Sequence, residues 1–327
     1  MRQPRRRVRW LARLGLVLGL LVLAGNALAW TQAWRMTHYV AAGQAPHLTT
    51  MTLPEKIAAV FTGFAIPRPE NRLTPQAVGL TYTTTLIPLP GTPDALEAWY
   101  VPAPQPRGLV LLCPPYIAAK ESLLAPAKAF HDLGYDTLLL DYRGVGGSPG
   151  SDTTLGVREA SDVATAAAYA RRAWPNRPLI LYGMSMGAAA VLRAVAVEGV
   201  RPAAIVVEAP FDRLLHAVEH RLDLLGLPDF PTAEALLFWG SVQQGFDGFA
   251  HNPAEYAAHI TCPTLVMRGA RDPEVSAADA AAVYDQLAGP RRFVEVPGAG
   301  HELLILAAPD LWRQQVGDFL STAGTVP

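Results

Sequence analysis

From residue 78 onward, short apolar runs rich in β-branched residues alternate with alanine-rich stretches of helical spacing. Predicted strands cover 78–87, 96–101, 108–113, 137–141, 178–182, 203–207, 264–268 and 292–296. Predicted helices cover 120–133, 158–173, 185–198, 276–287 and 304–321. Continuous apolar strands that alternate with helices form a mostly parallel sheet covered on both faces. The sequence therefore predicts an α/β fold, whose ligands bind beyond the carboxyl ends of the strands.

The composition fits a well-packed enzyme or binding protein. Apolar residues make up 50% of the 327 residues and charged residues 17%, so the chain can bury a sizeable core and is not disordered over most of its length. Residues 1–13 contain six arginines and no acid, which leaves a net charge of −7 on the rest. A basic surface for nucleic acid is therefore not expected, and no nucleic-acid partner is predicted.

The arginine-rich start is followed by an apolar run from Leu14 to Trp30 that only Asn26 interrupts. This pattern is typical of a membrane-targeting segment. Trp10 and Trp30 lie 20 residues apart, about 30 Å along a helix, so both indoles fit the two interfaces of one bilayer. The segment 27–29, Ala-Leu-Ala, also fits signal peptidase cleavage. We expect a single-pass bacterial membrane protein with its main domain on the outer face, or a secreted or periplasmic protein after cleavage.

The chain divides into an N-terminal signal anchor or signal peptide (1–30), a connector (31–76) and a main domain (77–327) with a strandless insertion at about 209–260. In the connector, Thr52 and Glu55 have the spacing of a capping box, and apolar residues follow at helical spacing. This predicts a short amphipathic helix. Its apolar stripe packs on the main domain, or else it lies on the membrane or covers a pocket.

A candidate nucleophile lies between the strand 178–182 and the helix after it. Gly183-Met184-Ser185-Met186-Gly187 has the pattern of a nucleophile elbow, in which a sharp turn projects the serine hydroxyl. The glycines let strand and helix approach closely. The N–H of Met186 then stands at a helix N-terminus, where it can stabilise a developing oxyanion.

A serine nucleophile needs a histidine base and a carboxylate that orients it. His301 follows the last predicted strand within a glycine-containing turn. Asp272 and Glu208 both follow strand ends, and we favour Asp272 because it gives the chain order serine, acid, histidine expected for this topology. Glu208 remains the alternative acid.

From about Leu80 to Leu320 the chain resembles the α/β-hydrolase superfamily, most closely the membrane-anchored bacterial members with a small cap that are often grouped with serine aminopeptidases. The resemblance rests on the segments 141–148, 182–187, 260–272 and 298–302. It implies an eight-stranded sheet, a hydrolytic triad and a cap inserted after the sixth strand, at the position of the insertion 209–260.

One loop departs from the family pattern. Cys113-Pro114-Pro115-Tyr116 stands where the family usually has His-Gly, and prolines have no N–H to donate. The second oxyanion donor is therefore predicted to be the N–H of Tyr116, with Ile117 in reserve. A rebuilt or lost oxyanion hole is equally compatible with this loop, which keeps a non-catalytic member as an alternative.

A rival motif lies in the insertion. His216, Glu219 and His220 match the H-x-x-E-H arrangement of inverted zinc peptidases, but the sequence offers no well-placed third ligand.

The sequence thus predicts a serine hydrolase that cleaves ester, thioester or amide bonds of a small-molecule or lipid-like acyl substrate and needs no cofactor or metal. The alternatives are a membrane-tethered, non-catalytic binding protein and a zinc peptidase using His216 and His220.

Overall fold

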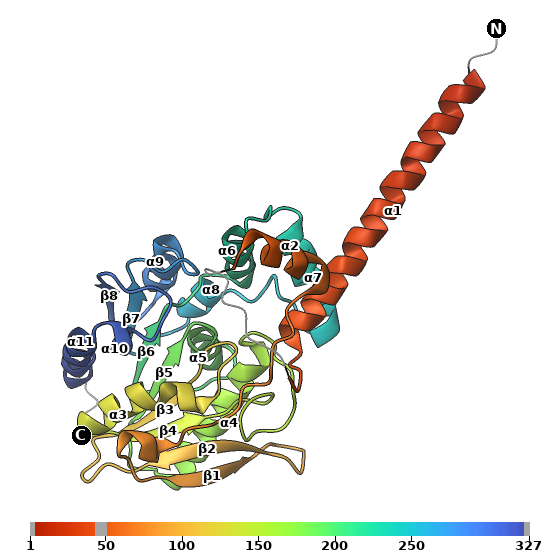
Figure 1. Ribbon diagram of the computed structural model, residues 1–327. Coiled ribbons are helices and arrows are strands. Elements are labelled where there is room, and N and C mark those ends of the chain that lie inside the picture. Colours follow the sequence, from red (N-terminus) through yellow and green to blue (C-terminus); the bar gives the residue numbers. More distant parts are fainter. Residues whose placement is uncertain (1–3, 43–50, 324–327) are drawn as a thin grey trace.

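The core of the protein is a single eight-stranded sheet (Figure 1), seen in a computed structural model that describes residues 4–42 and 51–323. The strands lie in the order β1-β2-β4-β3-β5-β6-β7-β8. Their bounds are β1 Thr83–Pro88, β2 Ala95–Val101, β3 Leu109–Cys113, β4 Asp136–Leu140, β5 Leu179–Met184, β6 Ala204–Glu208, β7 Thr264–Gly269 and β8 Arg291–Val296. β2 pairs antiparallel with β1 and β4, and the other pairings are parallel. The predicted α/β fold is confirmed.

Helices cover both faces of this sheet and extend beyond it (Figure 1). The α-helices are α1 Pro4–Thr37, α2 Leu53–Thr62, α3 Leu124–Asp132, α4 Val157–Ala173, α5 Met186–Ala196, α6 Leu214–Leu225, α7 Thr232–Gln244, α8 Pro253–Ala257, α9 Ala277–Gln286, α10 Leu304–Ala307 and α11 Pro309–Thr322. Two 3-10 helices, η2 Pro75–Val78 and η3 Lys120–Leu123, complete the described elements.

The central strands are buried on both faces, as their continuous apolar sequences predict. Leu109 and Leu111 of β3 pack in a cluster with α4, α5, α8 and α9. Val110 and Leu112 point the other way, into a cluster with α3, α10 and α11. This period-two division follows from the pleat of a strand and divides the core into two apolar layers.

The first strand begins later than predicted. Residues 78–82 were expected to be extended, but Val78 ends the 3-10 helix η2 and β1 begins only at Thr83. Pro75 starts η2, and Gly79 follows it with a left-handed φ of 75° that closes the turn. The prediction of a strand in this region is therefore confirmed, but its predicted first residue is wrong.

The last predicted helix, 304–321, is divided in two. α10 ends at Ala307 and α11 starts at Pro309. Ala308 between them has φ −144° and ψ 71°, since proline disfavours a helical conformation in the residue before it.

α1 is an unbroken helix that projects far from the sheet (Figure 1). Its part from Arg9 to Thr37 has a window of mean hydropathy 1.9 with none of that window buried, so it is long and apolar enough to cross a membrane. Such a helix is typical of both membrane anchors and signal sequences. The predicted division between residues 30 and 31 falls inside it, because α1 continues to Thr37 and packs on α7.

Trp312 links α11 to the sheet and provides a test of the packing. Its fully buried ring stands edge-on to Phe130 at 5.2 Å, and its indole N–H donates to the buried carboxylate of Glu208. Trp312→Ala leaves a large cavity and removes a donor, so the free energy of unfolding should fall by about 3–5 kcal/mol. Denaturation of the detergent-solubilised protein, followed by circular dichroism, measures this change.

Leu306→Ala, at a position 64% exposed, serves as the control and should change the free energy of unfolding by less than about 0.5 kcal/mol. Equal losses in both variants would contradict this account.

Candidate active site

Ser185 lies on a strained turn between β5 and α5. Its φ of 52° and ψ of −118° are unusual for a residue with a side chain, and such strain persists only where the surroundings enforce it. A Cβ at Gly183 would stand 2.4 Å from the carbonyl oxygen of Gly187, and one at Gly187 would stand 2.3 Å from that of Cys113. Only glycine fits at both positions, as the elbow pattern predicts.

The hydroxyl of Ser185 meets His301, which lies in the loop after β8. His301 Nε2 is 3.1 Å from Ser185 Oγ, and its Nδ1 is 2.8 Å from Asp272 Oδ2. An ionised carboxylate can only accept, so Nδ1 donates to Asp272 and Nε2 is left to accept the serine proton. The structure thus brings these three predicted residues into one hydrogen-bonded chain.

The Asp272 carboxylate is held firmly. Its side chain is fully buried, and its second oxygen, Oδ1, accepts the backbone N–H groups of Glu274 (2.8 Å) and Val275 (2.9 Å). Hydrogen bonds to the charged form of a carboxylate stabilise that form. The imidazole is therefore oriented by a fixed anion.

The carboxylate of Glu208, the alternative acid, has other partners, although the backbone carbonyl oxygen of Glu208 accepts the N–H of Ser185 at 2.8 Å. Its buried carboxylate accepts the N–H of Leu304 at 3.0 Å and the indole N–H of Trp312. Burial raises the pKa of Glu208 above its ordinary value. Its contacts are with α10 and α11, and the carboxylate on His301 is that of Asp272.

The two residues predicted to supply oxyanion donors are Met186, the neighbour of Ser185 in the chain, and Tyr116. Met186 is the first residue of α5, where N–H groups have no partner within the helix. Tyr116 follows β3 and lines the same cavity as Ser185 and His301, and the next residue, Ile117, has a φ of 59°.

The side chain of Tyr116 has a role that the sequence did not reveal. Its hydroxyl donates to the carbonyl oxygen of Met36 in α1, and the guanidinium of Arg221 lies 5.2 Å from its ring centre. Burial raises the pKa of Tyr116 to about 12, so it stays protonated and can donate. The loop after β3 is therefore attached to α1.

Glu274 was also missed. Its carboxylate pairs with Arg221 at 3.1 Å and lies 4.0 Å from His301 Nε2. The only available signal was its position two residues after Asp272.

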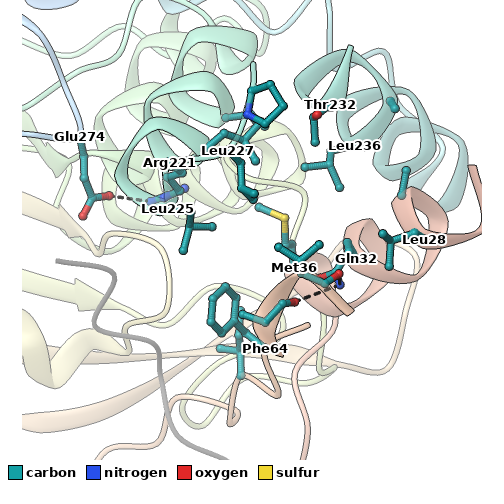
Figure 2. A pocket seen from close by; sticks show the side chains of 18 of the residues that line it. Leu28, Gln32, Met36, Phe64, Arg221, Leu225, Leu227, Thr232, Leu236 and Glu274 are labelled. Carbon is teal, nitrogen blue, oxygen red and sulfur yellow. Dashed lines mark hydrogen bonds and ion pairs between the residues drawn. The ribbon is translucent and has the colours of Figure 1, made fainter. Parts of the chain in front are cut away.

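The serine opens into a cavity of about 890 Å³ whose walls are mostly apolar. Figure 2 shows side chains from α1, Phe64 just after α2, and side chains of the cap helices α6 and α7 around this space. The charged pair Arg221 and Glu274 lies at the end near the serine. The predicted amphipathic helix is present as α2. Of its apolar stripe, Val60 lines the cavity together with Phe64 just after the helix, whereas Ile57 and Phe61 are exposed.

The zinc motif of the insertion forms part of α6. His216 Nδ1 lies 2.9 Å from Asp212 and 3.7 Å from Asp279, and these three residues are the one group in the described parts of the chain with metal-ligating geometry. His220 is not in this group, and its Nδ1 bonds the carbonyl oxygen of Glu274. Burial raises the pKa of Asp212 while His216 opposes the shift, which is expected of an ion-paired network.

Known proteins agree with this architecture. The family model described as "Serine aminopeptidase, S33" matches residues 104–228. An uncharacterized protein of Mycobacterium tuberculosis (strain H37Rv) is 31% identical over 211 residues, covering 63% of this chain and 68% of that protein. Lysophosphatidylserine lipase ABHD12 of Danio rerio is 28% identical over 44% of this chain and 37% of its own length.

Among solved structures, the Pyrococcus furiosus esterase Pf2001 superposes with a TM-score of 0.65 at 21% identity, covering 78% of this chain and 96% of the esterase. Est1E from Butyrivibrio proteoclasticus superposes with a TM-score of 0.58 at 20% identity, covering 72% and 98%. At these identities the likeness concerns the fold. The family model, the sequence relatives and this shared fold together establish that the chain belongs to the α/β-hydrolase superfamily of hydrolytic enzymes.

Proposed function

We propose that the protein is a membrane-anchored serine hydrolase that cleaves acyl esters, with thioesters and amides as related substrates, through Ser185, His301 and Asp272. The observation that carries this proposal is the hydrogen-bonded chain of these three side chains at the end of a large apolar cavity. An isolated serine is a weak nucleophile, and a base within hydrogen-bond reach, itself oriented by a carboxylate, is what activates it.

In the first half of the reaction, Ser185 Oγ attacks the carbonyl carbon while its proton moves to His301 Nε2. The negative charge that develops on the carbonyl oxygen is stabilised by the N–H groups of Met186 and Tyr116. His301 then gives the proton to the leaving alcohol, thiol or amine as the acyl-enzyme forms. Asp272 stabilises the transient imidazolium.

In the second half, His301 takes a proton from water, and the resulting hydroxide attacks the acyl-enzyme. Collapse of the second tetrahedral intermediate returns the proton to Ser185 Oγ and releases the acid.

The walls of the cavity favour an acyl substrate. Pockets of several hundred cubic ångströms with few polar groups bind hydrophobic ligands, and their polar groups fix the orientation. Here the charged residues lie near Ser185 and the apolar walls extend away from it. The ester therefore lies at the triad and the hydrocarbon chain in the cavity. The lipase activity in the name of the Danio rerio relative agrees with such a substrate.

A fluorophosphonate probe tests the nucleophile. The full-length protein in detergent should be labelled covalently, and Ser185→Ala should not be labelled, since it lacks the attacking oxygen. Ser148→Ala is the control, because Gly146-Gly147-Ser148-Pro149-Gly150 also matches the Gly-x-Ser-x-Gly pattern, but the hydroxyl of Ser148 donates to the carbonyl oxygen of Asp141. A folded wild-type protein that stays unlabelled would support the non-catalytic binding protein instead.

The identity of the acid can be tested by two amide substitutions. Asp272→Asn removes the anion that orients His301, so kcat for a p-nitrophenyl ester should fall by about 10³- to 10⁴-fold. Glu208→Gln keeps an acceptor for Trp312, so its kcat should stay within about tenfold of wild type while stability falls by about 1–3 kcal/mol. The opposite ranking of the two kcat values would make Glu208 the acid.

Metal analysis decides the zinc alternative. The purified protein should contain no stoichiometric zinc, and hydrolysis should resist a chelator, because the proposed chemistry uses only side chains and water. Stoichiometric zinc that His216→Ala removes, together with loss of activity, would favour a metallopeptidase. His259→Ala, which changes a histidine outside this group, is the control.

A further inference from the structure

The helix that can cross a membrane is also a wall of the active-site cavity. Residues spaced along one face of α1 line the cavity: Val22, Gly25, Asn26, Leu28, Ala29, Gln32 and Met36. Their spacing of three and four residues is that of one helical stripe. The residues of α1 from Arg9 to Ala27 are exposed and are therefore available for contact with lipid.

Polar contacts fix α1 against the catalytic domain. Gln32 donates to the carbonyl oxygen of Val60 at 2.7 Å, and Trp239 donates its indole N–H to Asn26 at 3.1 Å. The rings of Trp30 and Trp239 meet edge-on at 5.1 Å. With the bond from Tyr116 to Met36, these contacts run from the cap to the loop beside Ser185. These contacts therefore fix the position of α1 relative to Ser185.

The end of the cavity away from Ser185, which we call its outer end, lies beside the apolar part of α1. Val22 and Gly25 are exposed and belong to the apolar run that ends at Trp30. Val22 lies eight residues before Trp30, about 12 Å along the helix. If Trp30 marks the outer interface of the bilayer, this end of the cavity is within the hydrocarbon.

The elements around α1 expose large apolar side chains. Leu53 and Phe61 of α2 are each 70% exposed, Phe230 before α7 is 77% exposed, and Phe238 of α7 is 50% exposed. Both α2 and α7 contact α1 (Figure 1). Large exposed apolar side chains can mark contacts with proteins or membranes, and their place on elements that contact a helix able to cross a membrane favours the membrane.

The polarity of the cavity matches that of a lipid in the outer leaflet. The ion pair of Arg221 and Glu274 lies at the end near Ser185, and the apolar end extends along α1 toward its N-terminus. A lipid of the outer leaflet has the same orientation, with its ester near the interface and its chain toward the bilayer centre. From Met36 to Val22 the wall is about 21 Å long, a length that a long-chain acyl group can follow.

We propose that the enzyme takes acyl lipids directly from the outer leaflet, through the opening between α1, α2 and the cap, with an acyl chain lying along α1. This proposal rests on the proposed serine hydrolase activity and adds its substrate class and route of entry. α1 then forms one wall of the acyl-binding site as well as the anchor.

A bulky residue at Gly25 tests the acyl wall. A Cβ at Gly25 meets no atom within 4 Å, so Gly25→Phe can be accommodated and places a ring at the outer end of the cavity. Gly19→Phe is the matched control, since Gly19 also has nothing within 4 Å and does not line the cavity. Both full-length variants are assayed in phosphatidylcholine vesicles with p-nitrophenyl palmitate and butyrate.

The ratio of kcat/KM for palmitate to that for butyrate should fall about tenfold in Gly25→Phe, because several methylene contacts are lost, and stay unchanged in Gly19→Phe. An unchanged ratio in Gly25→Phe, or an equal fall in both variants, would overturn the role of α1. Wild-type protein that neither hydrolyses butyrate nor reacts with fluorophosphonate would instead overturn the hydrolase activity itself.

The route of entry is tested by separating enzyme and substrate. The palmitate ester is placed either in the vesicles that hold the enzyme or in a second, enzyme-free population. Hydrolysis should be fast only in the shared membrane. Equal initial rates in the two arrangements would show that the substrate arrives through water and would overturn the lateral route.

Discussion

The candidate site depends on the close approach of two backbone segments, the turn after β5 and the loop after β3. At Gly187 the chain passes so near the carbonyl oxygens of Cys113 and Pro114 that no side chain fits. This contact fixes the loop that carries Tyr116 beside the strained turn that carries Ser185. The strain at Ser185 is maintained because parallel pairing of β3 with β5 and of β5 with β6 holds the turn from both sides.

The fold and the three residues of the hydrogen-bonded chain could be predicted because each has a local signal. Ser185, Asp272 and His301 follow strands β5, β7 and β8, and parallel strands carry their carboxyl ends to one edge. The residues thus meet although 116 positions separate the serine from the histidine. The position of a strand end does not distinguish Asp272 from Glu208, but the chain order of the triad favoured Asp272, and the contacts of the two carboxylates agree with that choice.

The part played by α1 could not be predicted in the same way. The bond between Asn26 and Trp239 joins residues 213 positions apart, and that between Tyr116 and Met36 joins residues 80 apart. The spacing of apolar residues along the chain does not predict hydrogen bonds between residues so far apart. The one available signal was Asn26 itself, the single polar residue in the apolar run, since a polar side chain in such a segment usually has a partner.

The contacts of α1 also bear on the choice between a retained anchor and a cleaved signal peptide. Cleavage after Ala29 would remove Asn26 from Trp239 and withdraw Ala29 from its apolar cluster with Leu222 and Leu236. It would take away the outer wall of the cavity and leave the cap with an uncovered apolar surface, which is costly in water. Eight residues of α1, Trp30 to Thr37, would remain, of which Gln32 and Met36 line the cavity, and a helix this short depends on its packing to stay folded. The packing of α1 therefore favours the uncleaved anchor, because this helix completes the cavity beside Ser185.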